Sequence, residues 1–461
     1  MQLPDEFTSR MKDMLGESEY DQFDKAITST SPTSIRVNPL KPSMDIPYGQ
    51  IVPWCKTGRY LEQRPSFTFD PLFHAGSYYV QEASSMFVNH IISTLISRPS
   101  TVLDLCAAPG GKSTLAISAL PLGSVLIANE IVRQRANILA ENITKWGNPN
   151  TIVTNNCASD FQPLGAIFDL IICDAPCSGE GMFRKDLQSI DEWSTANVFM
   201  CQERQREILS DIWQCLKPGG LLIYSTCTYN TLENEENTAW AAEQLGAELL
   251  SIDIPSEWNV SGNKLSNSSF NVYRFFPHKT QGEGFFACIM RKNSDVEIPP
   301  TRAPKNKEHK KGADNRKGKE LPIPKDIKQW LFHPEQYTFK STPTSHTAFP
   351  TQHIHLLEQA LAHLKVIHYG ITIANIKGKT IIPAHSLAMS ASLNAKMFPS
   401  TELTEQQAIA YLRTESITLS TSTPTGYVLL KYKGLPLGFA KNIGNRANNL
   451  YPSEWRIRKS I

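Results

Sequence analysis

Strand-like and helix-like segments alternate between residues 101 and 292, and this alternation restricts the fold more than any other feature of the sequence. Short apolar runs, among them TVLDL, SVLIANE and FDLIICD, stand on either side of segments such as IVRQRANILAENITKW, where apolar residues recur at the three- and four-residue spacing of a helix. Strands that alternate with helices in this way form a parallel sheet with helices on both faces. We therefore expect an α/β domain whose ligand site lies at the carboxyl ends of the strands, where the strand order reverses.

The chain outside this unit divides into three further segments. Residues 1–100 predict a small N-terminal α/β domain. Residues 293–325 predict a basic linker, because nine Lys or Arg stand against three Asp or Glu between Arg302 and Lys325. This linker is either a solvated tether or a segment that contacts phosphates. Residues 326–461 combine helical and β-like runs in a separate C-terminal region.

Composition is that of an ordinary globular protein. Hydrophobic residues make up 41% and charged residues 20% of the chain, and no run of about eighteen apolar residues predicts a membrane-spanning helix. The N-terminal segment lacks the apolar stretch of a secretory signal, so we expect a cytoplasmic protein with no membrane partner. The nine cysteines are scattered without a CxxC pair. This spacing argues against a metal site or disulfides and leaves free thiols as candidate nucleophiles.

The segment DLCAAPGGKST follows the first strand of the 101–292 unit and opens a helix. It is not a phosphate loop of the Walker type, because Cys106 stands where that pattern needs a glycine. Its small-residue turn lets the amino-acid and ribose parts of a ligand lie against backbone at a helix N-terminus. Glu130 ends the second strand, where a carboxylate can accept hydrogen bonds from both ribose hydroxyls. The pattern indicates a nucleoside cofactor such as S-adenosyl-L-methionine (SAM); the alternative is a tight turn followed by a surface glutamate.

Two cysteines and an aspartate stand at the ends of two later strands. Asp174 and Cys177 follow FDLIIC on a loop rich in Pro and Gly, and Cys227 follows GLLIYST. A single free cysteine is usually a small buried apolar residue. Because the carboxyl ends of adjacent parallel strands share one edge, we expect these three side chains to converge on the ligand site.

Methylation of cytosine at carbon 5 needs this combination of groups. Carbon 5 is too weak a nucleophile to take a methyl group from SAM, and addition of a thiolate at carbon 6 turns the ring into an enamine that can. An acid hydrogen-bonded to N3 and the exocyclic amine stabilises the charge that develops there. A second cysteine can assist loss of the carbon 5 proton and release of the first thiol. The base must be reached outside a helical stack, so the substrate is a flipped or single-stranded nucleotide.

Four strings make the chain resemble the Nol1/Nop2/Sun family of RNA cytosine-5 methyltransferases. They are DLCAAPGGKS, DAPCSGEGMFRKD, YSTCTYNTLENEEN and GEGFFACIMRK. SIRVNPL and GSYYVQEASSM also match the family, so the resemblance covers residues 30–292. The layout of the whole chain is most similar to the bacterial 16S ribosomal RNA (cytosine-5) methyltransferase F subgroup. The resemblance implies a Rossmann-like SAM-dependent methyltransferase domain and a PUA-like RNA-binding domain in the C-terminal extension.

The resemblance also implies a role for each candidate residue. Cys227, in the Thr-Cys motif, would be the covalent nucleophile, and Cys177, in the Pro-Cys motif, would assist product release. Asp174 would hold the cytosine edge near the methyl group of SAM, and Glu130 would bind the ribose. The residues that would line the SAM site are Cys106, Ala107, Ala108, Pro109, Gly110, Gly111 and Lys112.

One position departs from the family pattern. Family members often carry an acidic residue after the third strand that reaches the adenine, whereas this chain reads TNNCASD there. Asn156 or Asp160 would have to substitute for it.

Other substrates and one non-enzymatic role remain as alternatives. DNA cytosine-5 methyltransferases place the nucleophile in a Pro-Cys motif without a Thr-Cys partner, so the two cysteines together favour RNA. The same chemistry on tRNA or 23S ribosomal RNA fits the catalytic motifs equally well, and the C-terminal region favours 16S ribosomal RNA. A non-catalytic RNA-binding ribosome-assembly factor would be expected to lose the catalytic side chains, which this chain keeps.

We expect a monomer that acts on 16S ribosomal RNA or on the small ribosomal subunit. We also expect loss of residues 326–461 to weaken RNA binding and to leave SAM binding intact, because the basic linker and the terminal WRIRK suggest that RNA affinity is partly electrostatic.

Overall fold

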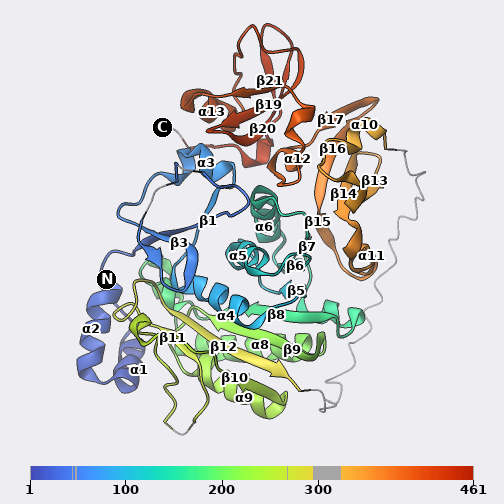
Figure 1. Ribbon diagram of the computed structural model, residues 1–461. Helices are drawn as coiled ribbons and strands as arrows, with labels where there is room; N and C mark the ends of the chain where they lie inside the picture. The colour runs from blue at the N-terminus through green and yellow to red at the C-terminus, as the bar shows by residue number, and fades with distance from the viewer. Residues whose placement is uncertain (1, 44, 47–48, 267, 294–322, 460–461) are drawn as a thin grey trace.

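Figure 1 shows the computed structural model of the chain, which describes residues 2–43, 45–46, 49–266, 268–293 and 323–459. Most of the expected basic linker lies outside these residues. Within them, a nine-stranded sheet runs through the middle of the molecule, and three sheets of four strands each lie around it. In the described part of the chain, no helix has the length and apolar character needed to cross a membrane.

The central sheet confirms the expected α/β fold. Its hydrogen-bonded order is β10-β12-β9-β8-β5-β6-β7-β15, with β11 paired to β12. Strands β7, β6, β5, β8 and β9 are parallel, and the strand order reverses between β5 and β8. The bounds are β5 Thr101–Asp104, β6 Val125–Asn129, β7 Thr151–Thr154, β8 Phe168–Asp174, β9 Leu216–Thr226, β10 Ala247–Leu250, β11 Tyr273–Phe275, β12 Phe285–Lys292 and β15 Val366–Tyr369.

The edges of this sheet differ from the all-parallel sheet that the alternation predicts. β12 runs antiparallel to β9, β10 and β11. At the other edge, β15 of the C-terminal region pairs antiparallel with β7. Apolar periodicity reports burial and not strand direction, so the sequence pattern could not reveal either pairing.

Helices cover both faces of the central sheet (Figure 1). Leu103 and Ile127 pack on one face with α8, α9 and α11, whereas Val102 and Leu126 pack on the other with α4 and α5. This division follows from the two-residue period of a strand, which sends successive side chains to opposite faces. The bounds are α4 Phe87–Leu95, α5 Gly111–Ala119, α6 Arg133–Trp146, α7 Gln188–Glu192, α8 Thr195–Trp213, α9 Asn237–Gln244 and α11 Ile354–His363.

The N-terminal region and the last sheet of the chain share one apolar core. The N-terminal elements are α1 Asp5–Leu15, α2 Glu17–Thr28, β1 Thr33–Val37, β2 Ile51–Val52, β3 Cys55–Leu61, α3 Pro71–His74 and β4 Tyr78–Val80. The last sheet and its helix are β18 Ser400–Glu402, α13 Glu405–Leu412, β19 Gly426–Tyr432, β20 Leu435–Asn442 and β21 Ala447–Asn449. Leu72 and Tyr78 of the first group pack with Tyr411 and Val428 of the second, and Figure 1 shows α3 next to this sheet.

The remaining sheet connects the C-terminal region to the central one. It consists of β13 Tyr337–Ser341, β14 Ser345–Pro350, β16 Ile371–Lys377 and β17 Thr380–Pro383, with α10 Lys325–Lys328 and α12 His385–Met389 on either side of it in sequence. After β14 the chain leaves this sheet, forms α11, adds β15 to the central sheet and returns as β16. A segment beyond residue 325 is therefore part of the central sheet.

Candidate active site

The loop between β5 and α5 forms part of the wall of a cavity of about 180 Å³. Gly110 caps α5 with a φ of +115°, a conformation that glycine adopts without strain. Tyr79–Glu82 and Ser85 of the N-terminal region complete the wall, and the sequence pattern did not indicate them. The predicted residues that line the cavity are Cys106, Ala107, Ala108, Pro109, Gly111, Lys112 and Asp174.

Asp104, the last residue of β5, is a candidate that the sequence motifs did not bring forward. Its side chain is buried, and Ser113 donates a 2.6 Å hydrogen bond to Oδ2. Oδ1 is also buried and has no hydrogen-bond partner among the described residues. Burial raises the pKa of this carboxyl to about 7 with help from the charges of Asp174 and Glu130, although the Ser113 hydrogen bond and Lys112 oppose the shift. An unsatisfied buried acceptor at this edge fits a ligand that brings a donor such as an ammonium group.

Glu130 lies directly after β6, and both oxygens of its carboxylate contact groups of the protein. Oε1 accepts a 2.9 Å hydrogen bond from the Val132 N–H, and Oε2 lies 3.5 Å from Nη1 of Arg135. Arg135 also donates to the carbonyl of Ala108 at 2.9 Å. These contacts link Glu130 to the β5–α5 loop, although Glu130 is not among the residues that line the cavity.

Asp174 and Lys112 form an ion pair at the cavity, with 2.8 Å between Oδ2 and Nζ. Ser225 of β9 donates a 2.8 Å hydrogen bond to the other carboxylate oxygen. Burial lowers the pKa of Lys112, but the charge of Asp174 and its hydrogen bond outweigh burial, so that the pKa is raised overall. Both carboxylate oxygens of Asp174 are therefore fixed between the β5–α5 loop and β9.

The two predicted cysteines meet at this edge of the sheet. Cys177 follows β8 and Cys227 follows β9, and their Sγ atoms lie 3.2 Å apart. The hydrogen bond to Cys227 and burial raise the pKa of the Cys177 thiol well above its ordinary value. The two thiols are therefore close enough to share one hydrogen bond, in which either sulfur can be the donor.

A buried polar network joins the two cysteine loops. Glu180 accepts hydrogen bonds from the N–H groups of Tyr229 and Asn230 at 2.7 and 3.0 Å. Glu233 accepts one from the N–H of Ser178 at 3.0 Å. The side-chain amide of Asn230 donates to both glutamates. Each loop can move only by breaking charge-assisted hydrogen bonds that are shielded from water.

Gly181 brings the two loops into direct backbone contact. Its N–H donates a 2.7 Å hydrogen bond to the carbonyl of Cys227. A Cβ at this position would lie 2.4 Å from the same oxygen, so the approach requires glycine.

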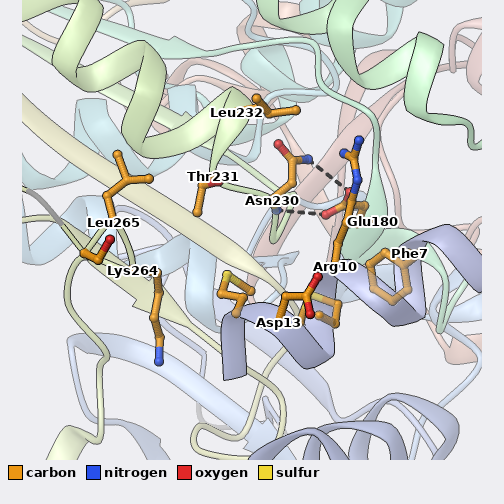
Figure 2. Close-up of a pocket in the computed structure, with 12 residues that line it drawn as sticks. Phe7, Arg10, Asp13, Glu180, Asn230, Thr231, Leu232, Lys264 and Leu265 are labelled. Atoms are coloured by element: carbon orange, nitrogen blue, oxygen red, sulfur yellow. Dashed lines mark hydrogen bonds between the residues drawn. The ribbon is translucent and has the colours of Figure 1, made fainter. Parts of the chain in front are cut away.

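A larger cavity of about 330 Å³ borders the contact between Glu180 and Asn230 (Figure 2). Phe7, Arg10 and Asp13 of α1 line it, together with residues 230–232 and 264–266. None of the candidate site residues is in its wall. Asp174 and the β5–α5 loop line the smaller cavity, whereas Cys177 and Cys227 line neither of the two.

The residues after β7 form a separate set of contacts. Nδ2 of Asn156 and the N–H of Cys157 both donate 3.0 Å hydrogen bonds to Oδ2 of Asp160. Oδ1 of Asn156 accepts a 3.0 Å hydrogen bond from the N–H of Lys365, which precedes β15. The amide of Asn156 is thus engaged at both ends, and of the two residues Asp160 is the better placed to accept from a ligand.

Known proteins resemble this chain over nearly its whole length. The ribosomal RNA small subunit methyltransferase F of Enterobacter sp. (strain 638) is 31% identical over 469 residues, which cover 98% of this chain and 95% of that protein. The corresponding protein of Salmonella agona is 31% identical over 98% of this chain and 96% of its own. The chain belongs to the 16S rRNA methyltransferase RsmB/F family. The resemblance inferred from the sequence motifs is confirmed.

Three family models match different parts of this RsmB/F-type chain. Residues 95–291 match 16S rRNA methyltransferase RsmB/F, and residues 3–83 match the N-terminal domain of 16S rRNA methyltransferase RsmF. Residues 398–457 match the methyltransferase RsmF PUA domain, which confirms the expected PUA-like domain. Residues 292–397, which include β15, lie outside these three matches.

Solved structures agree with the Rossmann-like methyltransferase fold. A methyltransferase homolog from Pyrococcus horikoshii is 30% identical, with a TM-score of 0.54 over 62% of this chain and 94% of that one. NSun6 from Pyrococcus horikoshii, whose crystal structure was determined with SFG, has a TM-score of 0.53 at 21% identity, over 63% of this chain and 99% of that one. The second likeness is one of fold alone.

Proposed function

We propose that this RsmB/F-type methyltransferase transfers a methyl group from SAM to carbon 5 of a cytosine in 16S ribosomal RNA, through a covalent bond between Cys227 and the base. The observation that carries the proposal is the 3.2 Å approach of the Cys177 and Cys227 sulfur atoms at the sheet edge that also holds the Asp174–Lys112 ion pair. Family membership supports methyl transfer to ribosomal RNA of the small subunit.

The residues at the carboxyl edge of the sheet fit SAM. The β5–α5 loop, Cys106–Lys112, would lie against its amino-acid and ribose parts, and the buried Oδ1 of Asp104 suits the ammonium group. Glu130 would accept hydrogen bonds from the ribose, and Asp160 would accept one from the adenine amine. The fold neighbour determined with SFG, a SAM analogue, supports the same class of cofactor. When bound, SAM supplies an electrophilic methyl group.

Cys227 would attack the cytosine ring as a thiolate. Its proton goes to solvent, a bond forms between its sulfur and carbon 6, and the electron pair of the C5=C6 bond moves towards carbon 5. The raised pKa of the Cys177 thiol, which comes from its hydrogen bond with Cys227 and from burial, supports Cys227 and not Cys177 as the nucleophile. Asp174 would accept hydrogen bonds from the exocyclic amine and from N3 once N3 has taken a proton from solvent, while Lys112 holds the carboxylate in place.

Cys177 would act once carbon 5 carries the methyl group. The sulfur of Cys227 is then covalently bound and uncharged, so the hydrogen bond that raised the pKa of Cys177 is lost. Cys177 can release its own proton to solvent and take the proton from carbon 5. The electrons of that C–H bond re-form the C5=C6 bond, and Cys227 leaves as a thiolate.

The RsmF-type matches at both ends of the chain favour small-subunit ribosomal RNA over tRNA or 23S ribosomal RNA. The convergence of two thiols with a fixed carboxylate favours an enzyme over a non-catalytic assembly factor.

Incubation of the protein with methyl-labelled SAM and small ribosomal subunits from cells that lack it tests the proposal. We expect label in 5-methylcytosine and none with Cys227→Ala. Label that appears only in tRNA or 23S ribosomal RNA would overturn the substrate. Label in no nucleoside of any of these RNAs would overturn the enzymatic function and favour an assembly factor.

A further inference from the structure

We propose that residues 345–369, which lie outside the three family matches, are a positioning element of the cofactor site. The segment contains β14, α11 and β15. The inference rests on the SAM-dependent function proposed above and adds to it a part of the chain that the catalytic motifs do not include. The evidence is a line of hydrogen bonds that runs from the β5–α5 loop to Lys365.

Asn129, the last residue of β6, ties the β5–α5 loop to the end of β7. Its carbonyl accepts a 2.8 Å hydrogen bond from the N–H of Ala107. Its side-chain amide donates to the carbonyls of Leu105 at 3.0 Å and Asn156 at 2.9 Å, and its Oδ1 accepts from the N–H of Asn156 at 3.0 Å. Asn129 is 2% exposed, so water does not compete for these bonds.

Lys365 completes the line from the C-terminal region. Its N–H donates to Oδ1 of Asn156, its carbonyl accepts from the N–H of Asn155, and its Nζ donates to Oδ1 of Asn155, each at 3.0 Å. Nδ2 of Asn155 in turn donates 2.8 Å hydrogen bonds to the carbonyls of Glu130 and Ile131. Two adjacent asparagines therefore connect Lys365 to both loops that would hold SAM.

Apolar packing fixes the same segment to the sheet. Phe349, Leu357 and Leu364 are buried in the core cluster that contains Ile152 of β7 and Phe161 of the loop that follows it. β15 extends the sheet beyond β7 by antiparallel pairing. Because the segment is held by both its core side chains and its backbone, a displacement of it would carry the end of β7 and the attached loops with it. We therefore no longer expect the C-terminal region to be removable without effect on SAM binding.

Two substitutions of Lys365 distinguish the effect of its backbone hydrogen bonds on the cofactor site from the effect of its side chain. Lys365→Pro removes the N–H that bonds to Asn156. Lys365→Ala keeps both backbone hydrogen bonds, loses only the Nζ contact with Asn155, and serves as the comparison. In the full-length protein, calorimetry with SAM should give a dissociation constant up to about tenfold higher for Lys365→Pro, the upper end of what one hydrogen bond contributes. The increase for Lys365→Ala should be smaller, since both backbone hydrogen bonds remain. Affinity for small-subunit RNA should be unchanged in both.

Hydrogen exchange of the wild-type protein tests the coupling without a variant. S-adenosylhomocysteine should slow amide exchange in β15 as well as at the β5–α5 loop, because coupling between two sites is reciprocal. Protection confined to residues 101–292, or equal SAM affinity in the two variants, would overturn the inference. Failure of the wild-type protein to bind SAM would instead overturn the proposed function.

Discussion

The sulfur of Cys177 lies 3.2 Å from that of Cys227, although 50 positions separate the two cysteines in the chain. Each follows a parallel strand, and because β8 and β9 are neighbours in the sheet their loops emerge side by side. The hydrogen bond between the two thiols, together with burial, raises the pKa of Cys177 well above its ordinary value. The division of roles proposed above, with Cys227 as the nucleophile, agrees with this raised pKa.

Replacement of each cysteine by alanine should give opposite results. Cys227→Ala removes the nucleophile and should abolish methyl transfer. Cys177→Ala should leave a covalent protein–RNA adduct that survives a denaturing gel, because release of Cys227 is impaired. Cys201→Ala, at a buried cysteine of α8, is the control and should form no lasting adduct. If the adduct formed with Cys227→Ala instead, Cys177 would be the nucleophile and Cys227 would assist product release.

Asp174→Asn should lower kcat by about 10²- to 10³-fold, the range found when one group that stabilises developing charge is removed. The KM for RNA should change little, because in the proposed mechanism Asp174, held by Lys112, stabilises charge that develops only after the base has bound. Steady-state methylation at saturating SAM measures both constants. Asp169→Asn is the matched control, since Asp169 stands at the start of β8 and pairs with Lys217. Equal effects of the two substitutions would contradict the role of Asp174.

Gly181→Ala should reduce both stability and methylation. The new Cβ would press on the carbonyl of Cys227 from 2.4 Å, and overpacking of this kind costs about 1–3 kcal/mol. Gly262→Ala, where a Cβ meets no atom within 4 Å, is the control. Thermal melting and methylation rates compare the two variants. A Gly181→Ala protein with wild-type activity would show that the Cys227 loop tolerates the displacement.

Asp104 should make stability depend on pH. Its pKa of about 7 in the folded protein lies above the ordinary value of 3.8, so the folded protein binds this proton more tightly than the unfolded chain. The resulting stabilisation is complete below about pH 4 and is lost as the pH rises to 7, by up to about 1.4 kcal/mol per pH unit. Asp104→Asn, which keeps an acceptor for Ser113, should therefore gain stability relative to wild type between pH 5 and pH 8 in urea unfolding. A difference that is independent of pH would mean that Asp104 does not titrate in this range.

The sequence by itself determined the parallel core of the methyltransferase domain and the sheet edge at which the candidate site residues lie. Apolar runs mark the strands, and the carboxyl ends of parallel strands all lie at one edge, so residues that end different strands must meet there. This reasoning predicts that Asp174, Cys177 and Cys227 lie close together, although it gives no distances between them.

The tertiary structure decided which segments that are distant in sequence pack against one another. The pairing of β15 with β7, and the core that α3 shares with the sheet of β18, β19, β20 and β21, depend on contacts between distant segments. Such contacts leave no local periodicity, because each segment shows only that one of its faces is apolar and not which partner covers it. The raised pKa of Asp104 has the same origin, since it comes from burial and from neighbouring charges that only the folded chain assembles.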